Sequence, residues 1–327
     1  MPLYDSILQT IGRTPIVRLN RVAPDHVTLY AKVESFNPGG SVKDRLALAV
    51  VLDAERKGLL KPGDTICECT SGNVGIALAM VSAARGYNFV AVMSDSYSVE
   101  RRKLIRAYGG KLLLFPGHLG SSGGNKIADE LAIKHGWFRA RQFDNPANPA
   151  FHRETTAAEI LSDFAGHRLN YFVTGFGTTG TLTGVGQMLK CARPDVTIVA
   201  AEPENAALMS GEKWNLHQIQ GWSPDFEPSV LDKTVIDRLL KIDEIKGRDM
   251  ARRLAAEEGI FVGISAGATV ATALDVAHSA PDGSVILAML PDTGERYLST
   301  FLFDGIKEGS DDEWLASIES EFLSEQA

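Results

Sequence analysis

The feature that most constrains the fold is an alternation, along the whole chain, of short β-branched or apolar runs with longer amphipathic ones. Short runs of this kind are typical of strands, and the longer runs have the apolar spacing of helices. Strand, helix, strand at this spacing predicts βαβ units, an α/β class and mainly parallel twisted sheets flanked by helices. The predicted strands are 29–33, 65–69, 89–93, 111–115, 171–174, 197–201 and 285–290. The predicted helices are 45–57, 74–85, 98–108, 124–135, 155–163, 182–190 and 247–258.

The length of 327 residues predicts two α/β halves, since domains commonly hold about 150 residues. The segment 141–149 (RQFDNPANP) is rich in Asn and Pro and is the clearest break between them. Two halves of similar character imply a cleft, where such folds usually bind a ligand. The acidic residues from about 308 onward predict a short peripheral helix.

Composition excludes several classes of protein. With 44% hydrophobic and 23% charged residues, the chain is not expected to be disordered, collagen-like or a disulfide scaffold. The net charge is −8 and the Lys and Arg residues are scattered, which argues against a nucleic-acid surface. We see neither a secretory signal nor an apolar run of membrane-spanning length, so we expect a soluble cytoplasmic protein with no membrane contact.

The cysteines and histidines do not predict a metal site. Cys67 and Cys69 lie two apart on a predicted strand and so face the same side. Free cysteines usually pack as small hydrophobic groups, and we expect buried free thiols here. The seven histidines have no metal-ligand spacing, so no metal is proposed. The charged run 100–103 (ERRK) is expected to be a solvated helix face.

The most conspicuous motif is GFGTTG at 175–180, a G-x-G-x-x-G between a predicted strand and a predicted helix. This context is that of a dinucleotide fingerprint, and Glu202 lies about twenty residues further on. An NAD-dependent dehydrogenase is therefore one alternative. Physically, the motif shows only that backbone N–H groups and a helix N-terminus face an anion, and any phosphate would satisfy it. A glycine turn without a ligand is the other alternative.

Lys43 lies in the first turn of a predicted helix, after the turn NPGGSV. The helix dipole disfavours a cation there, which would lower the pKa of the amine and suit it to Schiff-base chemistry. An exposed lysine capped by Asp44 is the alternative. Two further glycine-rich turns at helix starts, at 70–75 (TSGNVG) and 263–268 (GISAGA), would present N–H groups to anions. Three such turns and an activated lysine are too many for one dinucleotide site.

Together these elements resemble the cysteine synthase branch of the fold-type II pyridoxal-phosphate enzymes. The resemblance runs from IGRTP at 11–15 to LPDTGERY at 290–297, with SVKDR, TSGN, ERRKL, QFxNPAN and GISAGA in family order. It implies pyridoxal 5′-phosphate as the cofactor and Lys43 as the Schiff-base lysine. The implied cofactor-binding residues are Lys43, Asn73, Gly177, Thr178, Thr179, Gly180, Thr181 and Ser265, with Asn73 at the 3′-oxygen and Ser265 at the ring nitrogen. The implied residues for the substrate's α-carboxylate are Thr70, Ser71, Asn73 and Gln142.

The resemblance also implies the reaction. A family member is a transferase that replaces the acetate of O-acetyl-L-serine with sulfide, through an aminoacrylate intermediate, to give L-cysteine, with Lys43 as general base. It implies a cytoplasmic homodimer, with serine acetyltransferase as a candidate partner. The implied fold is like that of the tryptophan synthase β subunit, with a larger cofactor-anchoring domain (1–38 and 148–312), a smaller mobile domain (39–147) and an acidic tail (313–327).

Three departures from the family pattern leave the substrate open. Val74 stands where the family usually has Thr, which removes one hydroxyl donor. The segment 94–98 (SDSYS) places Tyr97 near the expected cleft mouth, and the segment 212–226 only partly fits the family's IQGIGAGF. Trp222 and Phe226 would narrow the entrance, and Lys213 could meet a phosphate. Alternatives are therefore O-phosphoserine, serine or cysteine as substrate, with replacement or elimination, and a non-catalytic binding protein.

Overall fold

The computed structural model describes residues 3–70 and 72–325, with the side chains of residues up to 318, and its strands form two sheets. The larger sheet contains β1 (Ile16–Leu19), β2 (Val27–Val33), β7 (Tyr171–Gly175), β8 (Thr197–Pro203), β9 (Arg238–Ile242) and β10 (Ser284–Leu290), in the order β1-β2-β10-β7-β8-β9. The smaller contains β3 (Thr65–Cys69), β4 (Asn88–Ser94), β5 (Lys111–Phe115) and β6 (Phe138–Arg139), in the order β5-β4-β3-β6. Of the described pairings, only β1 with β2 is antiparallel. The α/β class with parallel sheets is confirmed.

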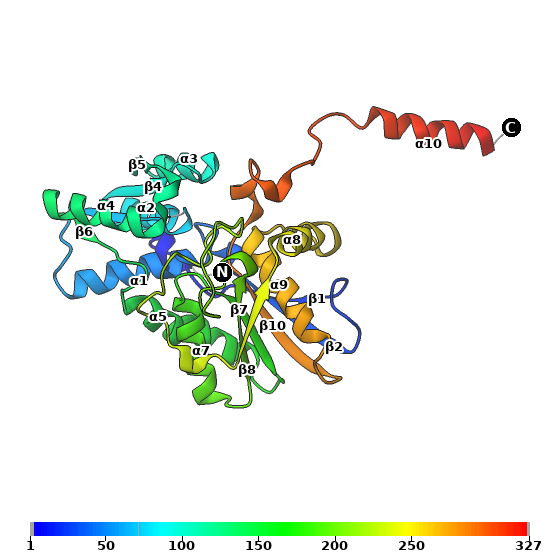
Figure 1. Ribbon diagram of the computed structural model, residues 1–327, viewed down its shortest axis with the longest axis horizontal. Helices are drawn as coiled ribbons and strands as arrows, with labels where there is room; N and C mark the ends of the chain where they lie inside the picture. Colours follow the sequence, from blue (N-terminus) through cyan, green and yellow to red (C-terminus); the bar gives the residue numbers. More distant parts are fainter. Residues whose placement is uncertain (1–2, 71, 326–327) are drawn as a thin grey trace.

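Helices flank both sheets (Figure 1). The helices near the smaller sheet are α1 (Lys43–Arg56), α2 (Asn73–Arg85), α3 (Val99–Ala107) and α4 (Gly120–His135). Those near the larger sheet are α5 (Ala147–Phe151), α6 (Ala157–Asp163), α7 (Gly180–Ala192), α8 (Glu244–Glu258) and α9 (Ile264–Ala277). Helix α1 packs against both α2 and α5, and so it connects the two parts. Helix α10 (Asp312–Glu325) projects away from the body in Figure 1.

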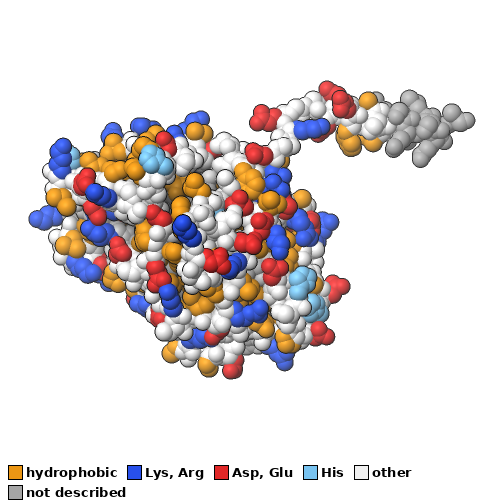
Figure 2. Space-filling model, viewed as in Figure 1, with side chains coloured by type: hydrophobic (Ala, Val, Ile, Leu, Met, Phe, Trp, Pro, Cys, Tyr) orange, Lys and Arg blue, Asp and Glu red, His pale blue; other side chains and the backbone are white. Residues whose placement is uncertain are grey.

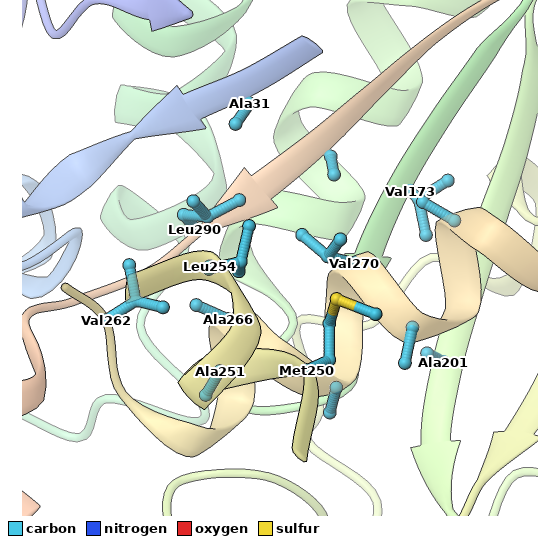
Figure 3. Packing of buried hydrophobic residues seen from close by; sticks show 14 of the residues in the cluster. Ala31, Val173, Ala201, Met250, Ala251, Leu254, Val262, Ala266, Val270 and Leu290 are labelled. Carbon is cyan, nitrogen blue, oxygen red and sulfur yellow. The ribbon is translucent and has the colours of Figure 1, made fainter. Parts of the chain in front are cut away.

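The larger sheet is buried on both faces, which explains why its strands are apolar without alternation. On one face, Val173, Ala201 and Leu290 pack with residues of α8 and α9 such as Leu254 and Val270 (Figure 3). On the other face, residues at the alternate strand positions pack with α6 and α7. A strand between two helical layers cannot show a polar face, so the sequence pattern identified these strands but not their two sides.

The predicted strands all exist, and three strands were missed. β1 and β9 lie at the two edges of the larger sheet, and β6 is a two-residue edge strand of the smaller one. Edge strands carry little apolar signal, because one side of each meets no neighbouring strand. The predicted helix 155–163 was wrong at its start, because a π-helix (His152–Thr156) joins α5 to α6 there. The expected break at 141–149 holds a turn and the first residues of α5, and the domain boundaries stay a prediction.

The sequence also led to expectations about the cysteines and about the charged surface. Cys67 and Cys69 are free, buried and packed with Val92 and Phe115, as expected. Figure 2 shows Lys and Arg side chains interspersed with Asp and Glu over the visible face. Of the helices within residues 3–70 and 72–325, none has the length and hydropathy that a bilayer crossing requires.

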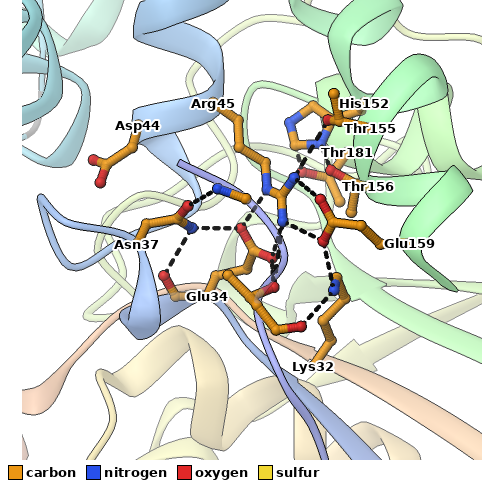
Figure 4. Close-up of polar contacts among 12 residues, drawn as sticks. Lys32, Glu34, Asn37, Asp44, Arg45, His152, Thr155, Thr156, Glu159 and Thr181 are labelled. Atoms are coloured by element: carbon orange, nitrogen blue, oxygen red, sulfur yellow. Dashed lines mark hydrogen bonds and ion pairs between the residues drawn. The ribbon is translucent and has the colours of Figure 1, made fainter. Parts of the chain in front are cut away.

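A buried ion network holds the start of α1 against the larger sheet (Figure 4). The Arg45 guanidinium contacts Glu34, which directly follows β2, with Nε–Oε2 at 2.7 Å, and Glu159 of α6 with Nη1–Oε1 at 2.7 Å. Lys32 of β2 completes the network with Nζ–Oε2 of Glu159 at 2.9 Å, and Thr14 donates its hydroxyl to Glu34. Lys32, Glu34 and Arg45 are fully buried. The two cations and two carboxylates therefore compensate one another away from water.

The same contacts displace the pKa values of the two carboxyl groups. Burial alone would raise the pKa of Glu34, but the charges of Arg45 and Lys32 outweigh it and lower that pKa. Burial is likewise outweighed at Glu159, where hydrogen bonds and charge from Arg45, together with Lys32, lower the pKa to about 2. Both carboxylates stay ionised in the folded protein well into acid.

We predict that Arg45→Met costs about 3–5 kcal/mol of unfolding free energy, because it leaves Glu34 buried without its nearest cation. Chemical unfolding followed by circular dichroism measures the loss. The control is Lys57→Met, which removes an exposed ion pair of α1 with Asp53 (Nζ–Oδ2, 2.6 Å) and should cost at most about 1 kcal/mol. Equal losses in the two variants would contradict the assigned role of the network.

The network also predicts an acid-sensitive contribution to stability. A carboxyl group whose pKa is lower in the folded state contributes stability above its unfolded pKa and loses it as the pH falls through the folded value. For Glu159 that window runs from about 4.5 down to about 2. Thermal unfolding measured at successive pH values should therefore decline less steeply across this window in Glu159→Gln than in the unchanged protein. Parallel curves would rule out Glu159 as a source of acid sensitivity.

Candidate active site

A cavity between the two sheets brings together most of the residues that the sequence singled out. The predicted residues that line it are Lys43, Asn73, Gln142, Gly177, Thr178, Thr179, Thr181 and Ser265. They come from the first turns of α1, α2, α7 and α9 and from loops at the carboxyl ends of strands, where open parallel sheets place their ligands. Gly180 belongs to the same loop, and Thr70 lies beside the cavity in an adjoining chamber. Ser71 lies outside the described residues.

Lys43 is the first residue of α1 and its side chain faces this cavity. Burial lowers the pKa of its amine to about 8, while the nearby negative charges of Asp292 and Glu34 oppose that shift. Desolvation is thus the main cause, where the sequence argument had invoked the helix dipole. Asp44 does not cap the lysine, because its Oδ2 accepts a hydrogen bond from the Gly39 N–H at 2.6 Å. The alternative of an exposed lysine capped by Asp44 is wrong.

Asn73, the first residue of α2, has its amide fixed from both sides. Its Nδ2 donates to Asp292 Oδ2 at 2.6 Å, and its Oδ1 accepts from Arg296 Nη1 at 2.6 Å. Tyr297 also donates its hydroxyl to Asp292 Oδ2, at 2.7 Å. One N–H of the Asn73 amide therefore remains for a ligand oxygen, and its direction is set by residues that follow β10.

The other substrate candidates are engaged in shaping the loops. Thr70 Oγ1 accepts hydrogen bonds from the backbone N–H groups of Gly72 and Gly75, each at 3.0 Å, so it holds the start of α2. Gln142 Nε2 donates to the Cys69 carbonyl at 2.6 Å.

The glycine-rich loop before α7 has the properties of an anion site. Thr179 has a φ of +64°, a strained conformation for a β-branched residue, and it ends the loop at the N-terminus of α7. At Gly180 a Cβ would come within 1.9 Å of Asn148 Oδ1, so only glycine allows this approach. The buried Thr179 Oγ1 and Asn148 Oδ1 have no hydrogen-bond partner among the described residues. Of these two groups only the Thr179 hydroxyl can donate, and an unsatisfied hydroxyl beside free helical N–H groups fits a phosphate ligand.

Ser265 lies in the first turn of α9, 4% exposed, on the larger-sheet side of the cavity. It places a neutral hydroxyl there. The dinucleotide interpretation loses its acidic partner, because Glu202 accepts hydrogen bonds from Met209 N, at 2.8 Å, and from Ser210 N, at 3.0 Å. That carboxylate holds a loop of its own segment.

The sequence analysis missed several residues that position the site. Arg101 was expected on a solvated face, and this was wrong: it is 2% exposed, its guanidinium lies 4.4 Å from the Tyr297 ring centroid, and it lines the cavity. Asp292, Arg296 and Tyr297 fix Asn73. The sequence contained a signal for these four residues, because ERRKL and LPDTGERY were both recognised as family elements. A motif does not show, however, which of its residues are buried.

A second chamber adjoins the cavity and shares Gln142, Phe143, Gln220, Gly221 and Trp222 with it. Two of the three departures from the family pattern line this chamber, namely Ser94, Ser96 and Tyr97 from one segment and residues 214–224 from the other. Of its described lining residues, none is Asp, Glu, Lys or Arg. Burial raises the pKa of Tyr97 and lowers that of His217, so both groups are neutral near pH 7. Lys213 is exposed and lies outside the lining.

Comparison with known proteins places this geometry in a family. The family model described as "Pyridoxal-phosphate dependent enzyme" matches residues 7–292. The chain is 77% identical over 320 residues to O-ureido-L-serine synthase of Streptomyces lavendulae, covering 98% of this chain and 99% of that one. It is 47% identical over 300 residues to a cysteine synthase of Staphylococcus aureus, covering 91% and 97%.

Solved structures agree with this assignment. The crystal structure of a K43A mutant of O-ureido-L-serine synthase bound to O-ureido-L-serine matches with a TM-score of 0.96 and 77% identity, covering 97% of this chain and 99% of that one. The cysteine synthase of Entamoeba histolytica matches with a TM-score of 0.88 and 37% identity, covering 97% and 95%.

The charge environment of Lys43 yields a prediction. An NMR titration of the cofactor-free protein with ¹³C-labelled lysine should show the Lys43 amine titrating near pH 8, with the signal assigned by its loss in Lys43→Met. Asp292→Asn removes a negative charge that stabilises the ammonium form, so the pKa should fall further. A Lys43 pKa near the ordinary value of about 10.4, or a rise in Asp292→Asn, would contradict the account.

Proposed function

The chain belongs to the cysteine synthase family of pyridoxal-phosphate-dependent enzymes, and from that premise we propose that it joins hydroxyurea to an activated L-serine to form O-ureido-L-serine. In this reaction the bond between the serine β-carbon and the acetate oxygen of O-acetyl-L-serine breaks. The hydroxyl oxygen of hydroxyurea bonds to that carbon, and its proton leaves with the acetate. The observation that carries the proposal is the uncharged polar chamber that the two departing segments build.

The cavity residues fit the cofactor. We propose that Lys43 would hold the cofactor at its aldehyde group, and that the loop 177–181 and the N-terminus of α7 would bind its phosphate, where Thr179 Oγ1 lacks a partner. Ser265 would face the ring nitrogen and Asn73 the ring oxygen. When bound, the cofactor withdraws electrons from the substrate α-carbon, and a neutral hydroxyl at its ring nitrogen keeps that withdrawal moderate, which favours loss of a β-leaving group.

The protein groups then handle protons and orientation. An amine with a pKa of about 8 is partly neutral at pH 7, so Lys43 can take the proton from the substrate α-carbon and return it later. Thr70, Ser71, Asn73 and Gln142 are the proposed contacts of the substrate carboxylate. Asp292 and Arg296 hold the Asn73 amide, so its remaining N–H is aimed before the substrate arrives.

The chamber favours a neutral, planar, hydrogen-bonding nucleophile. Its volume is about 340 Å³, and its polar lining comes from Ser, Thr, Gln, Tyr, Trp and His side chains. Such groups can pair with the N–H and C=O groups of a urea, whereas a sulfide ion needs no such partners. The relative that is 77% identical bears the name O-ureido-L-serine synthase, which supports the same choice.

Cysteine synthesis from sulfide is the second candidate function, supported by the relatives at 47% identity. O-phosphoserine is a further candidate. The chamber offers its dianionic leaving group no cation and Lys213 is exposed, whereas Arg101 lines the adjoining cavity. A cytoplasmic homodimer and a serine acetyltransferase partner remain expectations.

We predict that the cofactor-loaded enzyme converts O-acetyl-L-serine and hydroxyurea into O-ureido-L-serine, detected by mass spectrometry. Tyr97→Phe removes one neutral donor from the chamber and should lower kcat/KM for hydroxyurea by about tenfold, the effect of losing one buried hydrogen bond. Its kcat/KM for sulfide should barely change. Tyr108→Phe, directly after the last residue of helix α3 and outside the chamber, is the matched control. No O-ureido-L-serine product, or an equal loss for both nucleophiles, would refute the proposal.

A second prediction concerns Val74, which is 3% exposed, lines the cavity and packs in the apolar core of the smaller sheet. Val74→Thr places a hydroxyl at the family's usual position. We expect it to change KM for O-acetyl-L-serine by up to about tenfold, with little effect on KM for hydroxyurea, because the residue is outside the chamber. Unchanged KM values for O-acetyl-L-serine and O-phosphoserine would show that this position does not set the amino-acid substrate.

A further inference from the structure

Strands β8 and β9 both belong to the larger sheet, and the connection between them reaches across to the smaller-sheet part and returns. We call residues 212–230 the strap; this stretch contains no helix or strand. Its residues line the chamber, and Gln220, Gly221 and Trp222 also line the cavity. Several of its residues contact the smaller-sheet part, among them Gln220, Asp225 and Phe226. Gln220 accepts a hydrogen bond from Arg101 of α3, Phe226 packs edge-on to Phe143 with ring centroids 5.0 Å apart, and Asp225 contacts Ser122 of α4.

The Asp225 contact caps a helix that has no cap of its own. Helix α4 begins at Gly120, and its preceding residue, Leu119, provides no side-chain cap. Asp225 Oδ1 accepts from the backbone N–H of Ser122 at 3.1 Å, and Asp225 Oδ2 accepts from the Ser122 hydroxyl at 2.5 Å. A carboxylate at a helix N-terminus satisfies free N–H groups and opposes the positive end of the dipole. Here the capping residue comes from a segment 103 residues away.

This cap shapes a wall of the chamber. Gly120 and Ser121, the first two residues of α4, line the chamber. A Cβ at Gly120 would lie 2.7 Å from Asp225 Oδ2, and Gly120 has a φ of +62°, so the close approach requires glycine there. The position of Gly120 and Ser121 therefore depends on the hydrogen bonds that Asp225 accepts from the next residue, Ser122.

The strap is firmly fixed to the larger sheet just before Asp225. Ser223 has a φ of +39°, which is unusual for a residue other than glycine. Two hydrogen bonds fix it to residues outside the strap: its N–H donates to the Phe176 carbonyl at 2.6 Å and its hydroxyl to the Ala206 carbonyl at 2.6 Å. Within the strap, Trp214 Nε1 donates to its carbonyl at 2.8 Å. Only Pro224 separates this anchor from Asp225. The link between the two sheets is thus short and stiff.

We propose that Asp225 is a positioning residue for the addition of the nucleophile, the step that follows the loss of acetate. It ties the first turn of α4 to the strap and so sets the width of the chamber that binds the nucleophile. The residue lies in the segment that departs from the family pattern, where IQGIGAGF is replaced by IQGWSPDF. The identity of the nucleophile rests on the function proposed above, whereas the tie between strap and helix does not.

The test uses the cofactor-loaded enzyme and three variants. In Asp225→Ala, KM for hydroxyurea should rise about tenfold, while kcat at saturating hydroxyurea and the single-turnover release of acetate from O-acetyl-L-serine should change less than about twofold. Asp225→Asn keeps an acceptor oxygen at the helix start, and Asn caps helices about as well as Asp, so it should stay near the unchanged enzyme. Glu227→Ala is the control, since Glu227 pairs with Lys233 (2.5 Å) and is not part of the chamber lining.

Hydrogen exchange of the peptide spanning 120–124 gives a readout that does not depend on the nucleophile. Protection there should fall in Asp225→Ala and remain in Asp225→Asn and Glu227→Ala. Unchanged protection in Asp225→Ala would overturn the inference, as would an equal slowing of acetate release and nucleophile addition, or a failure of Asn to rescue. Should the enzyme prove inactive with hydroxyurea, the same KM comparison with sulfide and the same exchange result still decide the role of Asp225.

Discussion

The buried network of Lys32, Glu34, Arg45 and Glu159 is the interaction on which the arrangement of the site depends. It places two fully buried cations against two carboxylates at the point where α1 leaves the larger sheet. Burying Lys32, Glu34 and Arg45 is costly unless each is paired, and the partly exposed Glu159 completes the pairing. That condition fixes the first turn of α1 between β2 and α6, and hence the position of Lys43 two residues before Arg45.

Desolvation, which makes the pairing of the network charges necessary, also lowers the pKa of the Lys43 amine. Burial holds the pKa of Lys43 near 8, and Asp292 and Glu34 keep it from falling further. Asp292 in turn orients Asn73 and accepts from Tyr297, so one carboxylate links the charge of Lys43 to the orientation of the Asn73 amide. The residues of this arrangement follow strands of both sheets. The strap connects the larger-sheet part to the smaller-sheet part at another place, through Gln220, Asp225 and Phe226.

How far the sequence alone could predict this molecule differs from level to level. The central strands and the cavity residues Lys43, Asn73 and Ser265 could be predicted, because apolar runs and glycine-rich turns leave local signals. The edge strands β1, β6 and β9 could not, since each meets a neighbouring strand on one side only and carries little apolar signal. The burial of Arg101 and the cap on α4 by Asp225 depend on contacts between the two sheets. The amino-acid sequence alone showed that the segments 94–98 and 212–226 depart from the family. Only the fold shows that residues of both segments line one uncharged chamber.

We propose that this chamber selects a neutral ureido nucleophile, and a competition between two nucleophiles measures that selection. The enzyme is given saturating O-acetyl-L-serine with hydroxyurea and sulfide together at equal concentrations, and the two products are quantified over the first turnovers. The account predicts that O-ureido-L-serine exceeds L-cysteine, and that the excess shrinks when Tyr97 is replaced by Phe. A product mixture dominated by L-cysteine, with a ratio that Tyr97→Phe leaves unchanged, would contradict it.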